Sequence, residues 1–432
     1  MDYFSISGGK ALKGSVELSG AKNAASKMMI ASLLTEEEVI LTNVPKQEES
    51  FITEEIIHSV GGKTRWDNHT LTLQTKEILK TEVLSQTRKN RISILSLAPL
   101  LHRTGEGFVP MVGGDQIGPR PVNWHLETLQ KMGAVVVQKS DGYHATAPQG
   151  LSGALIELPY PSVGATETSL LAGVLASGRT VIRNAAVEPE ILELIKMLQK
   201  MGAILELGVG LEITIIGVEK LTGCHHRVIP DPLEAVSYAC IALGTHGEVF
   251  VKDAVHDHLI PFLNTVRRIG GAYFVQDDGI LFKTINGFSG LELETDAYPG
   301  FRTDWQQPLM VVLTQAHGTS VVHETVYESR FGYTQALNAM GADITLSSSC
   351  MGEILCRFKG LNHKHSAIIH GPRKLQAAHI EIPDIRAGLA FVIAALVAEG
   401  ISQLTGIEHL DRGYERLEEK LRGLGADIRR NG

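Results

Sequence analysis

The segment at residues 112–125 carries a carboxylate and a guanidinium, groups that can transfer a proton and hold an anion. It reads VGGDQIGPRPVNWH, with Asp115 after two glycines and Arg120 between two prolines. Glycines permit turns that other residues resist, and proline fixes φ. A strand pattern precedes the segment and a helical pattern follows it, which predicts an ordered but movable loop. Taken alone, a connector with solvated charges fits equally well.

A second carboxylate, Asp304, lies in the stretch GFRTDWQQ, where a turn opens another apolar helical pattern. Helix capping is the simplest role for it. Two acids near cations also suit addition–elimination on an anionic substrate. One acid removes a proton from an attacking hydroxyl, the other delivers a proton to carbon, and the cations stabilise the developing charge.

Polar or charged residues recur where apolar helical patterns begin. A buried helix start has unpaired N–H groups and a partial positive charge, so several starts facing one cleft would make an anion site. For each residue alone, a surface charge at a helix end is the simpler interpretation. The expected starts are Lys22 with Asn23, Arg91, Thr166, Glu234, Asp304 and Arg386, and the cations nearby are Lys22, Arg91, Arg120, Arg386 and Arg412.

The composition describes a globular protein with a large core. Of 432 residues, 44% are hydrophobic and 20% charged, which favours two domains. The net charge of −8 argues against nucleic-acid binding. The longest apolar run, residues 387–398, is too short to span a bilayer, and the first residues lack a signal-peptide pattern, so we expect a cytoplasmic protein.

The cysteines and histidines give no clear metal pattern. No acid or thiol pattern typical of a metal site accompanies the histidine pairs His225–His226 and His256/His258, so solvated loop histidines are the simpler interpretation. We therefore predict no metal and a reduced cytosolic setting. The four cysteines, which follow no zinc spacing and suggest no disulfide framework, are Cys224, Cys240, Cys350 and Cys356.

An internal repeat of about 70 residues organises the chain. One half of each copy is an amphipathic helix that ends in a glycine before a strand, and the glycine suits a left-handed helix C-cap. The other half is a helix that is apolar on nearly all sides, which is typical of a buried helix. The six copies of the first half have their glycines at Gly61, Gly133, Gly202, Gly270, Gly341 and Gly425.

The repeat predicts an α/β fold with helices inside and strands outside them. Six units fit either one array or two groups of three. VIPDP at 228–232 is a proline-punctuated link, which places a domain boundary between the third and fourth units. The first strand, within residues 1–21, could complete the C-terminal group, because the last unit lacks a final partner strand.

These stretches together resemble the enolpyruvyl transferases, in particular the branch that acts on UDP-N-acetylglucosamine. The matches run through the whole chain in order, which is far more specific than any one motif. They are SGAKNAA at 19–25, LTNVP at 41–45, GGDQIGPRPV at 113–122, SVGATET at 162–168, NAAVEPEI at 184–191, GFRTDWQQ at 300–307, DIRAG at 384–388 and HLDRGYERLEEKL at 409–421.

The resemblance implies a two-domain inside-out α/β barrel with three repeated units per domain. Domain I would span 22–229, and domain II would combine 1–21 with 230–432, with the active site in the cleft between them. The implied reaction moves enolpyruvyl from phosphoenolpyruvate to the 3′-hydroxyl of UDP-N-acetylglucosamine and releases phosphate, the first committed step of peptidoglycan precursor synthesis. It implies no metal or organic cofactor and no obligate protein partner, nucleic acid or membrane.

The resemblance also implies roles for individual residues. Asp304 would accept the sugar hydroxyl proton, and Asp115 would be the acid of the loop, with Lys22 and Arg412 at the catalytic centre. The residues implied to bind phosphoenolpyruvate are Lys22, Asn23, Arg120, Arg386 and Arg412. Those implied to bind the nucleotide sugar are Arg91, Arg120, Pro121, Val122, Asn123, Trp124, Ser162, Val163, Gly164, Asp304 and Val326, with Arg330 nearby.

Asp115 stands where the family usually carries a cysteine, although some members also carry Asp there. A carboxyl has a reference pKa of about 3.9 against about 8.5 for a thiol, so it needs burial or bound anions to be protonated near neutral pH. Fosfomycin alkylates the family's loop thiol, and a carboxylate is a much poorer nucleophile. We therefore expect Asp115 to be catalytic and the protein to resist fosfomycin.

Smaller departures concern the uridine end: Asn123, Trp124, Tyr160 and Pro232 replace residues that are more frequent in the family. Asn can still hydrogen bond to a uracil edge, and Trp can stack on it. The alternatives are a modified UDP-sugar, another acceptor such as shikimate 3-phosphate, a silent paralogue that only binds UDP-sugar, and a nucleic-acid enzyme. The acidic charge disfavours the last, and the intact set of Lys22, Asp115, Asp304, Arg386 and Arg412 disfavours the silent paralogue.

Overall fold

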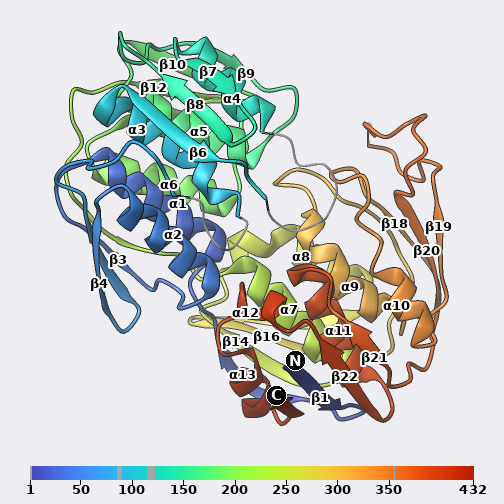
Figure 1. Cartoon of the computed structure of the whole chain (residues 1–432). Helices are drawn as coiled ribbons and strands as arrows, with labels where there is room; N and C mark the ends of the chain where they lie inside the picture. The colour runs from blue at the N-terminus through green and yellow to red at the C-terminus, as the bar shows by residue number, and fades with distance from the viewer. Residues whose placement is uncertain (1, 85–89, 114–121, 355) are drawn as a thin grey trace. The chain divides into compact units, whose positions relative to one another are not determined.

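The computed structural model describes residues 2–84, 90–113, 122–354 and 356–432. These residues form two compact units, one of residues 20–113 and 122–229 and the other of residues 2–19 with Pro230–Gly432 (Figure 1). Each unit has its own hydrophobic core. The expected loop, with Asp115, Arg120 and Pro121, lies outside the described residues.

The unit of residues 20–229 contains three copies of the repeat. Each copy places a buried helix before a strand, and an outer helix before a two-stranded hairpin. The elements are α1 (Lys22–Ala31), η1 (Ser32–Leu34), β3 (Val39–Thr42), α2 (Glu48–Ser59), β4 (Lys63–Asp67), β5 (Thr70–Gln74), η2 (Ile92–Ser96), α3 (Leu97–Thr104), β6 (Glu106–Pro110), α4 (Asn123–Lys131), β7 (Val135–Gln138), β8 (Gly142–Thr146), β9 (Leu155–Glu157), α5 (Val163–Gly173), β10 (Arg179–Arg183), α6 (Pro189–Lys200), β11 (Ile204–Leu207), β12 (Ile213–Ile216) and β13 (His225–Arg227).

The unit that ends at Gly432 repeats the same order of elements. Its first two strands come from the start of the chain. The elements are β1 (Tyr3–Ser7), β2 (Lys13–Glu17), α7 (Pro232–Gly244), β14 (Glu248–Lys252), α8 (His256–Arg268), β15 (Gly271–Gln276), β16 (Gly279–Thr284), β17 (Glu292–Glu294), η3 (Thr303–Trp305), α9 (Gln306–Leu313), β18 (Gly318–His323), α10 (Thr334–Ala339), β19 (Ile344–Ser347), β20 (Ser366–Gly371), β21 (His379–Glu381), α11 (Ile385–Val397), β22 (Ile401–Thr405), α12 (Glu408–Asp411), α13 (Leu417–Gly423) and β23 (Asp427–Asn431).

The sheets share one pairing pattern, in which antiparallel strands are joined at one edge by a parallel strand. In the sheet β15-β16-β14-β2, for example, β14 pairs antiparallel with β16 and parallel with β2. The same arrangement holds in the sheets β13-β3-β5-β4, β11-β12-β10-β9, β17-β18-β20-β19 and β21-β22-β1-β23. In the sheet β6-β8-β7, the described residues form an isolated parallel bridge, Glu82 to Phe108, where the other sheets have a fourth strand.

The helices that the sequence marks as apolar on all sides are buried. Every residue of α7 is buried, as is α11 from Ile385 to Leu396. α7, α9 and α11 pack on one another within their unit (Figure 1). Burial of these helices confirms the interpretation of their pattern, since a helix without a polar face has no side to offer to water.

The glycines that end the outer helices take left-handed backbone angles at all six predicted positions. Their φ values lie between 90° at Gly270 and 103° at Gly341. Only glycine reaches this region at little cost, which is why the residue recurs in every copy. The prediction that these glycines form left-handed helix C-caps is therefore confirmed.

The start of the chain differs from the single strand that was predicted within residues 1–21. β1 lies between β22 and β23 and pairs antiparallel with both, so it supplies the strand that the last repeat lacks. The segment then forms a second strand, β2, which pairs with β14 of a different sheet. The prediction of one strand was wrong because Gly8 and Gly9 break the segment before Lys13.

Two of the predicted polar residues lie near the helix starts, within the first turn, and not at the first position. α5 begins at Val163, before Thr166, and α7 begins at Pro232, before Glu234. In both cases a polar residue further upstream caps the helix: Ser162 accepts from Ala165 N, and Asp231 accepts from the backbone N–H groups of the first turn.

No helix in the described ranges is both long and apolar enough to cross a membrane.

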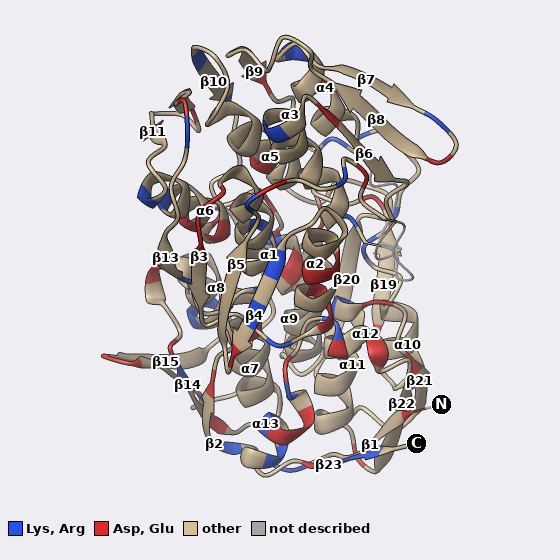
Figure 2. Cartoon of the chain, turned by 60° about the vertical axis from the view of Figure 1, so that its left-hand side comes forward, with Lys and Arg blue, Asp and Glu red and all other residues tan. Residues whose placement is uncertain are grey.

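Charged side chains are interspersed along both units. Lys and Arg positions and Asp and Glu positions are both scattered over the helices and strands (Figure 2). This distribution agrees with the modest negative charge of the sequence. An anionic ligand would therefore be held by local groups of cations, of the kind described next.

Candidate active site

Asp304 lies between two arginines in the unit that ends at Gly432. It sits in the short helix η3, directly before the buried helix α9, and its side chain is one-quarter exposed. Its Oδ1 accepts a hydrogen bond from Nη2 of Arg330, and its Oδ2 lies 3.6 Å from Nε of Arg386. Two cations favour the ionised carboxylate, which is the form that accepts a proton.

Arg386 is buried at the start of α11. The Asp384 side chain caps this helix by accepting from Arg386 N at 2.8 Å and Ala387 N at 3.0 Å. The guanidinium donates from Nη1 to the Tyr414 hydroxyl at 2.9 Å. Burial opposes the charge, but Tyr414, Asp304 and Asp231 together raise the pKa of Arg386, so the group stays cationic. A buried, fixed cation beside Asp304 is suited to an anionic substrate.

Glu324 organises the backbone around the Asp304 turn. It is fully buried, and its carboxylate accepts from Thr303 Oγ1 at 2.9 Å and from the backbone N–H of Val326 at 2.8 Å and Tyr327 at 3.1 Å. Burial raises the pKa of Glu324, against the effect of Arg330 and these hydrogen bonds. One side chain thus connects the turn before Asp304 with the loop that carries Val326.

Arg412 follows α12 and is half-buried. Its segment is joined to α11 through Tyr414, which receives the hydrogen bond from Arg386 and lies 3.3 Å from the Ser237 hydroxyl. The structure therefore brings Asp304, Arg386 and Arg330 into one charged group, and ties the Arg412 and Val326 segments to it.

Lys22 and Asn23 occupy the first positions of α1 in the other unit. Both are half-buried, and Lys22 Nζ lies 4.0 Å from Oε2 of Glu49 on α2. Among the described residues, the N-cap residue Ala21 makes no side-chain hydrogen bond to this helix start. A lysine at the N-terminus of a helix, where the helix dipole is positive, forms a place where an anion is stabilised.

The starts of α4 and α5 bring most of the expected nucleotide-sugar residues together. The two helices pack on each other, and His125 on α4 lies so close to Gly164 on α5 that a Cβ there would meet the imidazole at 2.7 Å. His125 Nδ1 is 2.7 Å from Thr168 Oγ1. Burial and the nearby charge of Arg91 lower the pKa of His125 to about 3, so the ring is neutral.

The residues expected to bind the nucleotide sugar differ in how far their side chains are exposed to solvent. Asn123 and Val163 are exposed, and Trp124 and Ser162 are half-buried, so each can reach a ligand. Val122, in contrast, has 4% of its surface exposed and packs in the core, which leaves its backbone as the only group for a contact. Pro232 is buried at the first turn of α7 and serves as a helix-start residue.

Several residues of this site were not found in the sequence. Glu324, Tyr414, His125 and Glu49 act on the expected residues through contacts between distant segments, such as the Arg386–Tyr414 hydrogen bond. Two signals were available: Tyr414 lies inside the quoted HLDRGYERLEEKL stretch, and His125 is the last residue of the segment at 112–125. No pattern marks Glu324 and Glu49.

Comparison with known proteins assigns the chain to a class. The family described as EPSP synthase (3-phosphoshikimate 1-carboxyvinyltransferase) matches residues 6–421. The chain belongs to this family of enolpyruvyl transferases, which are transferases of a carboxyvinyl group.

Curated relatives narrow the class. A protein of Chlamydia muridarum named UDP-N-acetylglucosamine 1-carboxyvinyltransferase is 48% identical and covers 99% of this chain and 98% of its own length. A protein of the same name from Protochlamydia amoebophila is 47% identical, over 99% of this chain and 94% of its own. The recognition of the family from the sequence is thereby confirmed.

Solved structures agree on the fold. The enolpyruvyl transferase NikO from Streptomyces tendae superposes with a TM-score of 0.87 at 22% identity, over 100% of this chain and 99% of that chain. EPSP synthase from Acinetobacter baumannii gives 0.76 at 19% identity, over the whole of both chains. These similarities show the α/β fold of the enolpyruvyl transferases.

Proposed function

We propose that this protein transfers the enolpyruvyl group of phosphoenolpyruvate to the 3′-hydroxyl of UDP-N-acetylglucosamine and releases phosphate. Relatives that carry the corresponding name match it over nearly its whole length at 47–48% identity. The observation that carries the proposal is the Asp304 carboxylate held between Arg330 and Arg386. A fixed carboxylate beside a cation is the pair needed to deprotonate a hydroxyl next to an anionic substrate.

In this proposal the reaction proceeds by addition and then elimination. Asp304 accepts the proton of the sugar 3′-hydroxyl as the oxygen attacks C2 of phosphoenolpyruvate, and Asp115 donates a proton to C3. Loss of phosphate from C2, with removal of a proton from C3, restores the double bond. Asp115 is assigned to its role from the sequence alone.

The cations hold the two acidic ends of phosphoenolpyruvate. We assign Arg386, Arg412, Arg120, Lys22 and Asn23 to this task, since planar guanidinium groups bind carboxylate and phosphate with two parallel hydrogen bonds. Support comes from Arg386, which is buried and oriented by Tyr414 before any substrate arrives. A cation that is already fixed stabilises the developing charge without reorganisation.

The nucleotide sugar is assigned to the starts of α4 and α5. The backbone N–H groups of Ser162, Val163 and Gly164 open α5 and suit a diphosphate. Arg91 and Arg120 add charge, while Asn123 and Trp124 offer an amide and an aromatic face to uracil. Pro121, Val122 and Val326 are assigned backbone or packing contacts.

We also propose the finer architecture that the resemblance implies. Domain I comprises 22–229 and domain II comprises 1–21 with 230–432, each an inside-out α/β barrel of three repeats. Three sheets and three sets of buried helices in each unit support this arrangement. The residues assigned to the reaction include Lys22 of one unit and Asp304 of the other. Both substrates are small molecules, and a cytoplasmic location fits them.

The experiment is phosphate release from phosphoenolpyruvate with UDP-N-acetylglucosamine, with shikimate 3-phosphate, or with no acceptor. We expect release only with the nucleotide sugar, and a loss of at least about 10²-fold in Asp304→Asn. Asp277→Asn, at an exposed turn between β15 and β16, is the matched control and should retain full activity. Release with shikimate 3-phosphate alone would identify another acceptor, and binding of the nucleotide sugar without release would indicate a protein that only binds it.

A further inference from the structure

Four potential metal ligands from distant parts of the sequence meet beside the sheet β17-β18-β20-β19. His323 ends β18, His365 directly precedes β20, and Cys350 and Cys356 lie in the segment between β19 and β20. Their ligand atoms all lie within 4.8 Å of one another. His323 and His365 have no exposed surface, Cys356 has 6%, and Cys350 is half-buried.

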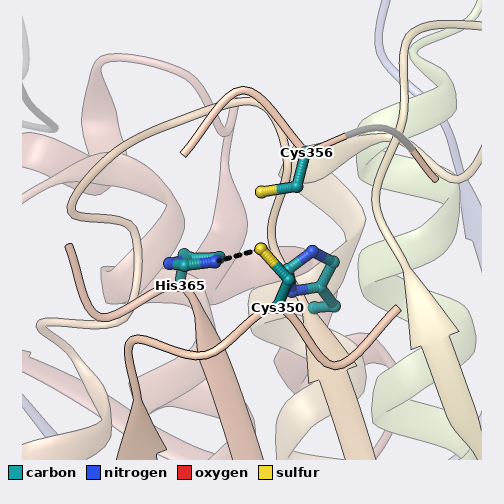
Figure 3. Close-up of side chains that lie close together, drawn as sticks. Cys350, Cys356 and His365 are labelled. Atoms are coloured by element: carbon teal, nitrogen blue, oxygen red, sulfur yellow. Dashed lines mark hydrogen bonds between the residues drawn. The ribbon is translucent and has the colours of Figure 1, made fainter. Parts of the chain in front are cut away.

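Hydrogen bonds orient the ring of His365 for coordination. Its Nδ1 lies 2.6 Å from the carbonyl oxygen of His363, which can only accept a hydrogen bond and therefore assigns the N–H to Nδ1. Its Nε2 then carries a lone pair, and this atom points to Cys350 Sγ at 3.5 Å (Figure 3). Metal-binding histidines in proteins are commonly held in this way, by a carbonyl on the nitrogen that does not bind.

Two hydrogen bonds through Ser366 likewise place the N–H of His323 on Nδ1. The Ser366 hydroxyl donates to the Ser349 carbonyl at 2.7 Å, so its oxygen is left to accept from Nδ1 of His323 at 2.8 Å. The Nε2 atom of His323 consequently carries a lone pair. This atom is buried and finds no hydrogen-bond partner among the residues that the structure describes. A buried acceptor without a partner is costly unless something binds it.

The cysteine sulfurs complete the set. Cys356 Sγ accepts from the backbone N–H of Phe358 at 3.4 Å, a contact that stabilises a thiolate. Figure 3 shows the side chains of Cys350 and Cys356 converging toward His365. Two nitrogens and two sulfurs are the donor set that zinc prefers in closed tetrahedral sites.

The spacing of the ligand atoms fits a tetrahedral ion. Zinc lies about 2.3 Å from sulfur and about 2.0–2.1 Å from nitrogen, which places sulfur and nitrogen ligands about 3.6 Å apart. The observed Cys350–His365 separation is 3.5 Å. No two ligand atoms of the group lie more than 4.8 Å apart, so tetrahedral coordination requires a contraction of at most about 1 Å.

We propose that His323, Cys350, Cys356 and His365 form a structural zinc site. All four positions are filled by side chains, so the ion leaves no open position for a substrate. The site fastens the segment between β19 and β20 to the ends of the central strands β18 and β20. Arg357, next to Cys356, donates to the Val326 carbonyl and lies 3.7 Å from Glu328, so this fastening also supports the loop that follows Glu324.

The test is the metal content of protein purified under reducing conditions without added chelator. We expect about one zinc per chain, and its loss in Cys350→Ser and Cys356→Ser. Cys224→Ser is the matched control, since Cys224 is a half-buried free cysteine of the other unit, and it should keep the ion. Replacing zinc with cobalt should give thiolate-to-cobalt charge-transfer absorption in the unmodified chain and in Cys224→Ser only.

The role is tested separately from the presence of the ion. Removing zinc with a strong chelator should lower the unfolding temperature of the unmodified chain and leave that of Cys350→Ser unchanged. Folded, reduced protein that holds neither zinc nor cobalt would overturn the proposal, as would a disulfide between Cys350 and Cys356 in protein purified without oxygen. None of these readings depends on the proposed enzymatic reaction.

Discussion

Nε of Arg386 lies 3.6 Å from Oδ2 of Asp304, so the expected proton acceptor and an expected anion-binding group are already paired before substrate binds. The pair is held from both sides. Arg330 contacts the other carboxylate oxygen, and Tyr414 accepts from the far side of the Arg386 guanidinium. Neither side chain can therefore be altered without moving the other.

We expect Arg386→Lys to lower kcat/KM for phosphoenolpyruvate by about 10²-fold, although the charge is kept. A lysine lacks the planar fork that contacts Asp304 and Tyr414 together, so it cannot hold both the carboxylate and a substrate anion. Steady-state kinetics with each substrate varied in turn would measure this. Arg373→Lys, at an exposed ion pair with Asp343, is the matched control and should leave the kinetics unchanged. Equal activity of both variants would contradict the role of Arg386.

Gly164→Ala should raise KM for the nucleotide sugar and leave KM for phosphoenolpyruvate nearly unchanged. The added Cβ would meet the His125 ring at 2.7 Å, and the ring is held by Thr168, so the start of α5 must move. A shift of about 1 Å at a substrate-positioning element can cost about 10²-fold. Gly423→Ala is the control, because a Cβ there meets nothing within 4 Å. A rise in both KM values would point to a general disturbance instead.

The burial of Glu167 makes stability depend on pH. Burial raises the pKa of Glu167 to about 7, against the opposing effect of Lys27, whose Nζ lies 4.0 Å away. The unfolded chain has a value of about 4.3. The contribution of Glu167 to the free energy of unfolding is therefore complete below about pH 4.3. It is lost as the pH rises through 7, which lowers the free energy of unfolding by roughly 3 kcal/mol.

Glu167→Gln should remove this dependence, since the amide cannot ionise. The difference in unfolding free energy between the variant and the unmodified chain should grow from pH 5 to about pH 8 in favour of the variant. Denaturant titrations at several pH values would measure it. Glu206→Gln, at an exposed position of β11, is the control and should show no such trend. A constant difference across this range would contradict the raised pKa.

The repeat was visible in the sequence because it depends on local rules. Glycines at helix ends and helices without polar residues follow from backbone angles and solvation, and each copy repeats them. The structure places Gly61 and Gly425, at the two ends of the chain, in the same left-handed conformation. β2 was missed because its partner, β14, lies more than 200 residues away.

The residues with expected chemistry were found through family resemblance, and their supporting residues were not. Glu324 looks like any glutamate in the sequence, yet it is fully buried and holds the Val326 backbone. His323 of the proposed zinc site ends β18, far in the sequence from Cys350, Cys356 and His365, so no short spacing joins it to the other three ligands. Such groups depend on strand pairing between distant segments, here β18 with β20.

Asp115→Cys should make the protein sensitive to fosfomycin while it continues to release phosphate. A thiolate is a far better nucleophile than a carboxylate, and the family's loop cysteine is the group that fosfomycin alkylates. The unmodified chain should show no time-dependent inactivation. Intact-protein and peptide mass analysis of the loop should show the adduct in the Cys variant alone.

Asp115→Ala and Asp115→Asn complete the test of the loop acid. Both remove the proton donor, so we expect phosphate release to fall by about 10²-fold or more, the usual contribution of a general acid. KM for the nucleotide sugar should change little, because the carboxyl is assigned to proton transfer rather than to binding. Near-full turnover in Asp115→Ala, or a fosfomycin adduct on the unmodified loop, would require another residue to protonate C3 of phosphoenolpyruvate.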